Sequence, residues 1–341
     1  MSTVDVGHRT EPLTMKAVDV GNKTDDLWIQ TTHSPLLDGV NSIIACLGVL
    51  GNGMVITVML LRRRVFSSFT NRLILHQSVI DCVTCVVFFL WRVVFQNVYK
   101  NVSLEGNIYD QLICRFIYVD YFLWCLDVTS TCNLVMISLE RFMATCHPVK
   151  HRNTWTPAKL KFAVATAWAI GFIYGSHFVF MFEARQGRCR FVELKIGWKI
   201  FEASAVITVE YLVPIIILIY TYSRIFIVIK KSANLLNGPR NFINKAKKNI
   251  LVTTMLISIM FVVCWTPIEV FYVCAYISGI WGGWLYATFT GLLACNMFVN
   301  PIIYCFKYEH FRSELKSLVI RRCRTSRVGD GEAIPIPAAT P

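Results

Sequence analysis

The sequence predicts an all-α membrane protein, a seven-transmembrane helix bundle followed by a short amphipathic eighth helix. Of its 341 residues, 55% are hydrophobic and only 16% are charged, whereas about a quarter of the residues of a soluble domain are charged. The hydrophobic residues form continuous runs that are long enough to cross a bilayer as helices. Because polar and apolar residues do not alternate within the runs, the runs do not fit the strands of a membrane β-barrel.

Positive charge gathers in every second segment between these runs. Arginine and lysine are concentrated in the first, third and fifth connecting segments and after the last run, at residues 62–72, 150–161, 224–248 and 307–327. Loops rich in these residues stay on the cytoplasmic side of a membrane. The pattern therefore predicts an extracellular N-terminus and a cytoplasmic C-terminus, and it explains the net charge of +13 without a nucleic-acid partner.

The chain divides into four parts. Residues 1–35 are polar and are expected to form a disordered extracellular tail, in which Asn22 begins a glycosylation sequon. Residues 36–306 hold the transmembrane domain. Residues 307–320 alternate basic and apolar side chains, as an amphipathic helix on the inner membrane surface does, and residues 321–341 are expected to be a disordered cytoplasmic tail. The seven spans are expected at about 37–61, 73–95, 114–147, 160–182, 201–229, 250–277 and 284–306.

The first three spans carry polar groups that a plain apolar helix lacks. Asn52 lies in span one, Asp81 lies deep in span two with Arg92 near its outer end, and Asp127 lies in the middle of span three. The segment between spans two and three holds a second glycosylation sequon at Asn101.

The last three spans each contain a proline, at positions 214, 267 and 301. Proline removes a backbone hydrogen bond and kinks a helix. Three successive kinks indicate a bundle that bends, although membrane helices also tolerate proline without such a role.

Polar side chains in the spans must face one another or water, because charged groups facing lipid cost at least a few kcal/mol each. Five of them fall near mid-membrane on different helices: Asn52, Asp81, Ser130, Asn296 and Asn300. They form either a cluster that holds a small cation or separate hydrogen bonds between helices, and the spacing alone leaves both readings open.

Three carboxyl groups map to the outer half of the bundle. They are Asp127 in span three, Glu210 in span five and Glu269 in span six. Three acids near a cavity indicate a cationic ligand or a basic side chain of a peptide. The alternative is that they pair with local groups such as Arg92 or stay protonated in hydrogen bonds.

Span three ends with the pair Glu140-Arg141 beside a basic loop. Residue chemistry alone favours an interfacial anchor, in which Arg141 stays on Glu140. The other reading is a switch, in which Arg141 exchanges partners when helices move.

A motif in every span, in order along the chain, carries a resemblance to a known family. The motifs are Gly51-Asn52, Asp81, Glu140-Arg141-Phe142, Trp168, Pro214, Cys264-Trp265-Thr266-Pro267 and Asn300-Pro301-Ile302-Ile303-Tyr304. Together, over about residues 37–320, they resemble the rhodopsin-like (class A) G-protein-coupled receptors. The resemblance implies a plasma-membrane receptor that binds an extracellular ligand and activates heterotrimeric G proteins, with arrestin as a further partner and no enzymatic activity.

The resemblance also implies an activation switch. Arg141 would leave Glu140 and turn toward the G protein, with Tyr222 and Tyr304 as its tyrosine partners, while Trp265 would move beneath the ligand. The remaining members of the switch are Pro267, Asn300 and Pro301.

Three further sites follow from the resemblance. The positions implied for an allosteric sodium ion are Asp81, Ser130, Asn296 and Asn300. A disulfide is implied between Cys114 and Cys189, and a palmitoylation site is implied at Cys323.

The chain departs from the family pattern at several positions. Cys114 lies 27 residues before Arg141, two more than is usual, so helix three begins differently or the cysteine precedes it. Lys247 stands where some members carry an acidic partner for Arg141. Leu123 replaces the aspartate of amine receptors, and Ala294 replaces the lysine of opsins.

These departures make a peptide the favoured ligand class and an amine the alternative. An ion-coupled transporter is a remote alternative, because transporters usually contain internal repeats and none is visible. A membrane hydrolase would need a nucleophile–base pair or clustered metal ligands, and we find neither in the sequence.

Overall fold

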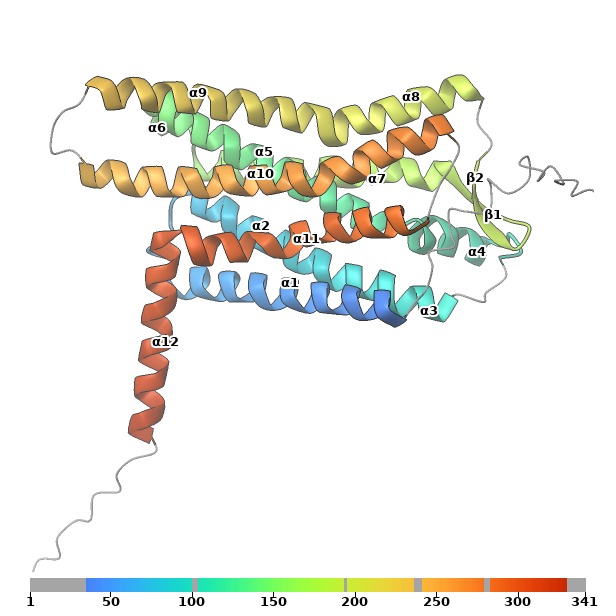
Figure 1. Cartoon of the computed structure of the whole chain (residues 1–341), viewed down its shortest axis with the longest axis horizontal. Coiled ribbons are helices and arrows are strands. Elements are labelled where there is room, and N and C mark those ends of the chain that lie inside the picture. Colours follow the sequence, from blue (N-terminus) through green and yellow to red (C-terminus); the bar gives the residue numbers. More distant parts are fainter. Residues whose placement is uncertain (1–34, 100–103, 193–194, 236–240, 279–282, 330–341) are drawn as a thin grey trace, which may run out of the picture.

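The computed structural model describes residues 35–99, 104–192, 195–235, 241–278 and 283–329. The two sequons, at Asn22 and Asn101, lie outside these ranges. Figure 1 shows an elongated helical bundle with a β-hairpin at one end and helix α12 at the other. These are called the hairpin end and the α12 end below.

Seven spans within the described ranges are long and apolar enough to cross a membrane, which confirms the predicted seven-helix bundle. They are built from α1 (Pro35–Leu61); α2 (Phe69–Phe89) with the π-helical turn η2 (Leu90–Phe95); α4 (Ile108–Ile113), the π-helical turn η3 (Cys114–Tyr118) and α5 (Tyr121–Cys146); α7 (Pro157–Met181); α8 (Ile196–Ile207), the π-helical turn η4 (Thr208–Leu212) and α9 (Val213–Leu235); α10 (Asn241–Ser278); and α11 (Gly283–Lys307). Shorter helices and the hairpin connect the spans: α3 (Gln96–Tyr99), α6 (Pro148–Thr154), β1 (Phe182–Arg185) and β2 (Arg188–Phe191).

The surface of the bundle is apolar while its interior holds polar groups. Phe162, Ile173 and Phe226 are 75%, 72% and 68% exposed, whereas large apolar side chains of this kind are mostly buried in soluble proteins. Asn52 and Asp81 are buried instead. This distribution is expected where lipid surrounds the helices and polar groups can be satisfied only inside the bundle.

Helix α5 is the centre of the bundle and packs against α2, α7 and α9. Two glycines on one face of α7 allow the closest of these approaches. A Cβ atom at Gly171 would lie 2.5 Å from the backbone oxygen of Cys125, and one at Gly175 would lie 2.2 Å from Cys125 Sγ. Small residues spaced four apart bring two membrane helices into direct backbone contact in this way.

The third span is broken after Cys114, which agrees with the expectation that helix three begins differently or that the cysteine precedes it. The segment that includes Cys114 forms α4 and η3, and α5 begins only at Tyr121. Between them, Asp120 adopts a left-handed conformation with φ of 54°, which aspartate tolerates better than most residues. The break takes up the extra residues between Cys114 and Arg141.

The last three spans each contain a proline. Because proline has no N–H group, the backbone carbonyl four residues before it has no donor within the helix. Pro214 follows directly after the π-helical turn η4, while Pro267 and Pro301 lie inside α10 and α11. Pro301 cannot donate to the carbonyl four residues before it, that of Met297. Asn52 Nδ2 of α1 donates to that oxygen instead, at 2.8 Å, so the kink in α11 is joined to α1.

A disulfide holds the hairpin against the third span. Strands β1 and β2 are antiparallel, and Gln186 and Gly187 between them both have positive φ, as a tight hairpin turn requires. Cys189 of β2 is bonded to Cys114 of η3. This pairing, implied by the family resemblance, is confirmed.

Helix α12 (Glu309–Gly329) leaves the bundle at a steep angle to the spans (Figure 1). It extends past Ile320, where the sequence analysis placed the end of the amphipathic helix and the start of a disordered tail. No proline or glycine interrupts the chain before Gly329, so nothing local ends the helix earlier. Phe311 is fully buried against the bundle, and Arg62 pairs with Glu314 at 3.0 Å. Cys323 lies on this helix, but its side chain is outside the described part.

Candidate functional site

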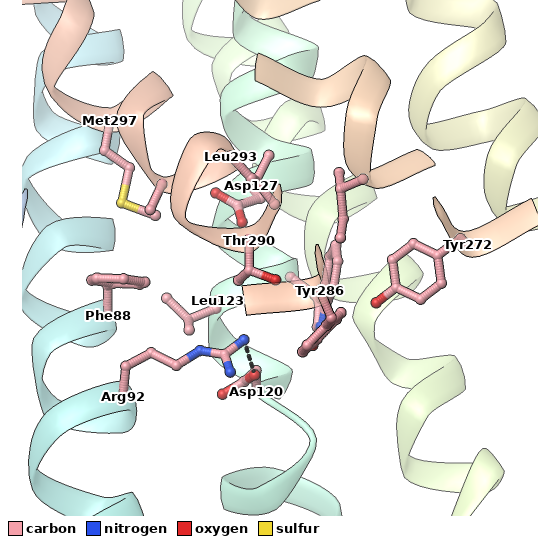
Figure 2. A pocket seen from close by; sticks show the side chains of 13 residues that line it. Phe88, Arg92, Asp120, Leu123, Asp127, Tyr272, Tyr286, Thr290, Leu293 and Met297 are labelled. Atoms are coloured by element: carbon pink, nitrogen blue, oxygen red, sulfur yellow. Dashed lines mark ion pairs between the residues drawn. The ribbon is translucent and has the colours of Figure 1, made fainter. Parts of the chain in front are cut away.

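A pocket opens among four segments of the bundle (Figure 2). Its lining includes Arg92 of η2 and Asp120, which follows η3, so it lies in the half of the bundle toward the hairpin end. Its walls come from α2 and η2, the start of α5, α10 and α11. Leu123 and Ala294, the positions that distinguish the chain from amine receptors and opsins, both line it. The charged residues of the lining are Arg92, Asp120 and Asp127.

Arg92 and Asp120 form an ion pair across the pocket. Arg92 Nη2 lies 2.6 Å from an oxygen of Asp120, and the two side chains are only 11% and 13% exposed. The left-handed turn at Asp120 places this carboxylate at the head of α5 (Figure 2). Arg92 therefore pairs with Asp120 and not with Asp127, the partner that was an alternative from the sequence.

Asp127 lies about two helical turns further along α5 than Asp120. It lines the pocket, and the ion pair marked in Figure 2 joins Arg92 to Asp120 and not to Asp127. Because Arg92 and Asp120 offset each other, Asp127 supplies the remaining formal charge of the lining. The arrangement therefore offers one carboxylate to a ligand.

The other two predicted acids do not line this pocket. Glu210 lies in η4 and is 2% exposed, and Glu269 lies in α10 and is 4% exposed. The hydroxyl of Tyr174 donates to Glu210 Oε2 at 2.6 Å. Glu210 is thus held by a partner on α7 that its position in the sequence does not reveal, and the role of Glu210 and Glu269 beside Asp127 in ligand binding stays a prediction.

A second cluster surrounds Asp81 near the middle of the bundle. Ser130 Oγ and Gln77 Nε2 donate to Asp81 Oδ1 at 3.1 Å and 2.9 Å, and Asn300 Nδ2 donates to Asp81 Oδ2 at 2.8 Å. Of the four positions predicted for sodium, three thus converge. Asn296 makes no hydrogen bond to them in the described structure, while Gln77, which the sequence analysis passed over, does. Its position four residues before Asp81 on the same helix was the available signal.

Arg141 rests on Glu140 at the α12 end of α5. Its Nε and Nη2 atoms donate to the two oxygens of Glu140 at 2.6 Å and 2.8 Å. Thr70 Oγ1 donates to Glu140 Oε2 at 2.6 Å, and His151 Nε2 of α6 lies 3.0 Å from Glu140 Oε1. Glu140 is 1% exposed, so its carboxylate joins α2, α5 and α6.

The two tyrosines predicted as partners of Arg141 are bonded elsewhere or have no partner in this conformation. Ser258 Oγ donates to Tyr222 at 3.3 Å. Tyr304 is fully buried, and its hydroxyl has no hydrogen-bond partner in the described structure. The pairing of Arg141 with Glu140 is the arrangement expected before a switch, and the exchange of partners stays a prediction.

Trp265 lies in α10 about one turn before Ile268, which lines the pocket. It is 1% exposed, and its ring packs on that of Phe261 with centroids 5.4 Å apart. Pro267 follows it in α10, so the bend in this helix lies next to the tryptophan.

At the α12 end, Asn249 of α10 is tied to the junction of α11 and α12. Asn249 Nδ2 donates to the carbonyl of Lys307 at 2.7 Å, and the amide of Glu309 donates to Asn249 Oδ1 at 3.0 Å. The side chain of Lys247, on the same helix, is outside the described part. Helix α10 is therefore held at this end by an asparagine that the sequence analysis did not consider.

Tyr308 lies between the last span and α12. Its hydroxyl donates to Asn71 Oδ1 of α2 at 2.7 Å, and burial raises its pKa to about 12. The hydroxyl therefore keeps its proton at physiological pH and joins the base of α2 to the start of α12.

Comparisons with known proteins agree with this architecture. The family model of the 7 transmembrane receptor (rhodopsin family) matches residues 51–304. Galanin receptor 2b of Danio rerio is 24% identical over 294 residues, which cover 84% of this chain and 75% of that protein. Cephalotocin receptor 2 of Octopus vulgaris is 27% identical over 325 residues, with 82% and 70% covered. Galanin receptor type 2 of Homo sapiens is 24% identical over 294 residues, with 81% and 71% covered.

Proposed function

Because the chain belongs to the rhodopsin family of seven-transmembrane receptors, and is thus a multi-pass G-protein-coupled receptor of the plasma membrane, we propose that it binds an extracellular peptide whose basic group pairs with Asp127. The observation that carries this proposal is the position of Asp127, which lines the pocket while Arg92 is already paired with Asp120. A cation brought by the ligand would find a carboxylate that forms no ion pair among the described residues, because Arg92 is paired with Asp120.

The pocket and the relatives both favour a peptide over an amine. Leu123 is apolar where an amine receptor carries its aspartate, and the acid of this pocket lies one turn deeper, at Asp127. The similar proteins are receptors for galanin and cephalotocin, which are peptides. A ligand with a side chain that reaches inward fits an acid in this position.

The hairpin end is proposed to face the extracellular side. The disulfide between Cys114 and Cys189 lies at that end, and disulfides form in oxidising compartments. The opposite end carries Arg62, α6 and the basic helix α12, and positively charged segments stay in the cytoplasm. The N-terminus is then extracellular and the C-terminus cytoplasmic.

Signalling is proposed to begin with Arg141 leaving Glu140. The pair is half of a network that also includes Thr70 and His151, so Arg141 can leave while Glu140 keeps two partners. These two contacts still satisfy the buried carboxylate of Glu140 after Arg141 has left, which lowers the free-energy cost of moving Arg141 to new partners. The freed guanidinium then faces the cytoplasmic side, where the G protein binds and arrestin competes for the same end.

The test is a ligand screen on receptor reconstituted with a heterotrimeric G protein, with nucleotide exchange as the readout. Synthetic peptides that contain arginine or lysine are compared with small amines, and activation by a peptide is expected. Asp127→Asn keeps the shape of the side chain and removes its charge. A hydrogen bond to a charged group contributes about 1.5–3 kcal/mol, so the potency of the active peptide should fall roughly 10- to 150-fold.

Two controls make this assignment specific. Asp38→Asn makes the same substitution at the outer end of α1, away from the pocket lining, and should leave potency unchanged. A peptide whose basic group is replaced by a neutral isostere should lose potency on the wild type but not on Asp127→Asn, because the two changes remove the same pair. Activation by amines alone, or equal potency of the peptide on Asp127→Asn, would refute the proposal.

A further inference from the structure

A continuous chain of hydrogen bonds crosses the bundle from α7 and ends at Asp81. It begins at Trp168, whose indole Nε1 donates to His76 Nε2 at 2.9 Å. His76 Nδ1 lies 2.8 Å from Asn133 Oδ1, and Asn133 Nδ2 donates to Gln77 Oε1 at 2.8 Å. Gln77 Nε2 then donates to Asp81 Oδ1 at 2.9 Å. Gln77 thus stands between α5 and the carboxylate.

The first bond fixes the direction of all the others. An indole nitrogen donates and never accepts, so His76 Nε2 is the acceptor and the single ring proton is on Nδ1. His76 Nδ1 therefore donates to the oxygen of Asn133, which leaves the amide nitrogen of Asn133 for Gln77 Oε1. The nitrogen of Gln77, with its two N–H groups, has to face Asp81.

A second, independent contact gives the same direction. Asn133 Nδ2 also donates to the backbone carbonyl of Leu73 at 3.0 Å, and a carbonyl can only accept. The amide of Asn133 is therefore oriented from two sides. Because its nitrogen also reaches Gln77 Oε1, Gln77 cannot turn its own oxygen toward Asp81 without losing that donor.

The nitrogen of Gln77 takes the position between two of the oxygens predicted to bind sodium. It contacts Ser130 Oγ as well as Asp81 Oδ1, and these two oxygens are themselves 3.1 Å apart across a hydrogen bond. Hard cations are held by oxygen atoms with available lone pairs. An amide nitrogen that carries N–H groups supplies none and directs positive charge toward the place where the cation would sit.

The other predicted ligands do not complete a cation site either. Asn300 turns its amide nitrogen, not its oxygen, toward Asp81 Oδ2 at 2.8 Å. Asn300 Oδ1 is buried and has no hydrogen-bond partner in the described structure, but it is the nitrogen of this amide, and not this oxygen, that contacts Asp81. Asn296 makes no described hydrogen bond to the cluster. The residues present therefore do not fit a sodium ion as they are arranged.

We propose that the side-chain amide of Gln77 takes the place of the sodium ion, so that Asp81 joins α2, α5 and α11 through protein donors alone. The consequence is a receptor whose central cluster is insensitive to sodium. The N–H groups of Gln77 bridge Asp81 and Ser130 as a bound cation would, but they are part of the chain and cannot dissociate.

The experiment measures sodium binding without any ligand or G protein. Purified receptor is melted in NaCl and in KCl at equal ionic strength, up to about 150 mM. An ion that binds the folded state raises the melting temperature by mass action. Wild type is expected to melt at the same temperature in both salts.

Three variants complete the test. Gln77→Ala removes the amide and leaves Asp81 and Ser130 in place, so it should acquire a melting temperature that rises with sodium and not with potassium. Adding Asp81→Asn to Gln77→Ala should abolish that rise. Thr84→Val, which removes a hydroxyl of α2 bonded only within its own helix, should remain insensitive to sodium.

Two results would overturn the proposal. One is a sodium-specific rise in the wild type that Asp81→Asn removes. The other is a folded Gln77→Ala receptor that does not respond to sodium. If Gln77→Ala does not fold, Gln77→Ser replaces it, and the wild-type measurement decides the question without any variant.

Discussion

Replacing Asn249 by alanine should raise basal signalling, because Asn249 holds α10 against the junction of α11 and α12. Its two partners are the carbonyl of Lys307, at the end of α11, and the amide of Glu309, at the start of α12. Helix ends leave such groups without intrahelical partners, so one asparagine satisfies both. Movement of α10 away from the bundle would break both bonds together.

The expected size of the effect follows from these two bonds. A typical intramolecular hydrogen bond contributes about 0.5–1.5 kcal/mol net, and the exposed location of both favours the lower half of that range because water can replace either partner. Their loss should therefore shift the equilibrium toward the open form by about 1–2 kcal/mol. This corresponds to a roughly 5- to 30-fold rise in the open population.

The assay is basal nucleotide exchange on a heterotrimeric G protein by equal amounts of receptor without ligand. Asn249→Asp keeps an acceptor for the amide of Glu309 and loses the donor to Lys307, so its basal rate should lie between wild type and Asn249→Ala. Thr253→Val removes a hydroxyl that bonds only to the backbone of its own helix and should behave as wild type. A basal rate of Asn249→Ala at or below that of wild type would refute the reasoning.

Three further sets of substitutions test the remaining sites. Asp120→Asn should lower the free energy of unfolding by about 3–5 kcal/mol, because it leaves Arg92 buried without a counter-charge. Adding Arg92→Met to the same chain should recover part of this loss. A melting temperature of Asp120→Asn equal to that of wild type would contradict the prediction. Arg141→Ala should sharply reduce ligand-stimulated nucleotide exchange while the receptor still reaches the cell surface, and unchanged exchange would remove Arg141 from the switch. Cys114→Ser, Cys189→Ser and the double variant should show the same loss of surface expression, whereas additive losses would argue that the bond contributes nothing to folding.

The number and order of the spans could be predicted from the sequence because lipid imposes an apolar run of minimum length on each helix. The interruptions within the spans could not. The only sign in the sequence of the left-handed turn at Asp120 is that Cys114 lies two residues further from Arg141 than is usual. Many different local structures could accommodate two extra residues. The hydropathy of the chain gives no indication of the π-helical turn η4 before Pro214.

These interruptions explain why the ligand pocket was predicted only in part. The levels of Asp127, Glu210 and Glu269 along their helices follow from a rise of about 1.5 Å per residue, but the directions of their side chains require an unbroken helix. A π-helical turn holds an extra residue, and Glu210 lies inside one. Its side chain accepts a hydrogen bond from Tyr174 of α7, and it is not among the residues that line the pocket with Asp127.

The polar partners were missed for a different reason. Gln77 needs Asn133 to orient it, and the two are 56 residues apart in the chain. A glutamine in a membrane helix shows that some partner exists, but hydrogen-bond direction depends on every member of the chain back to Trp168. Only the three-dimensional arrangement supplies that sequence of donors and acceptors.

The same chain of bonds indicates which helices can move during signalling. Helices α2 and α5 are joined through Gln77, Asn133 and Asp81 by charged or amide groups inside the bundle, and breaking such a bond would leave a buried polar group unsatisfied. Helices α10 and α11 are kinked at Pro267 and Pro301, and α10 is held at the α12 end by exposed bonds of Asn249. Movement at that end is therefore expected to cost least in α10, with the α2–α5 pair as the fixed frame from which Arg141 turns.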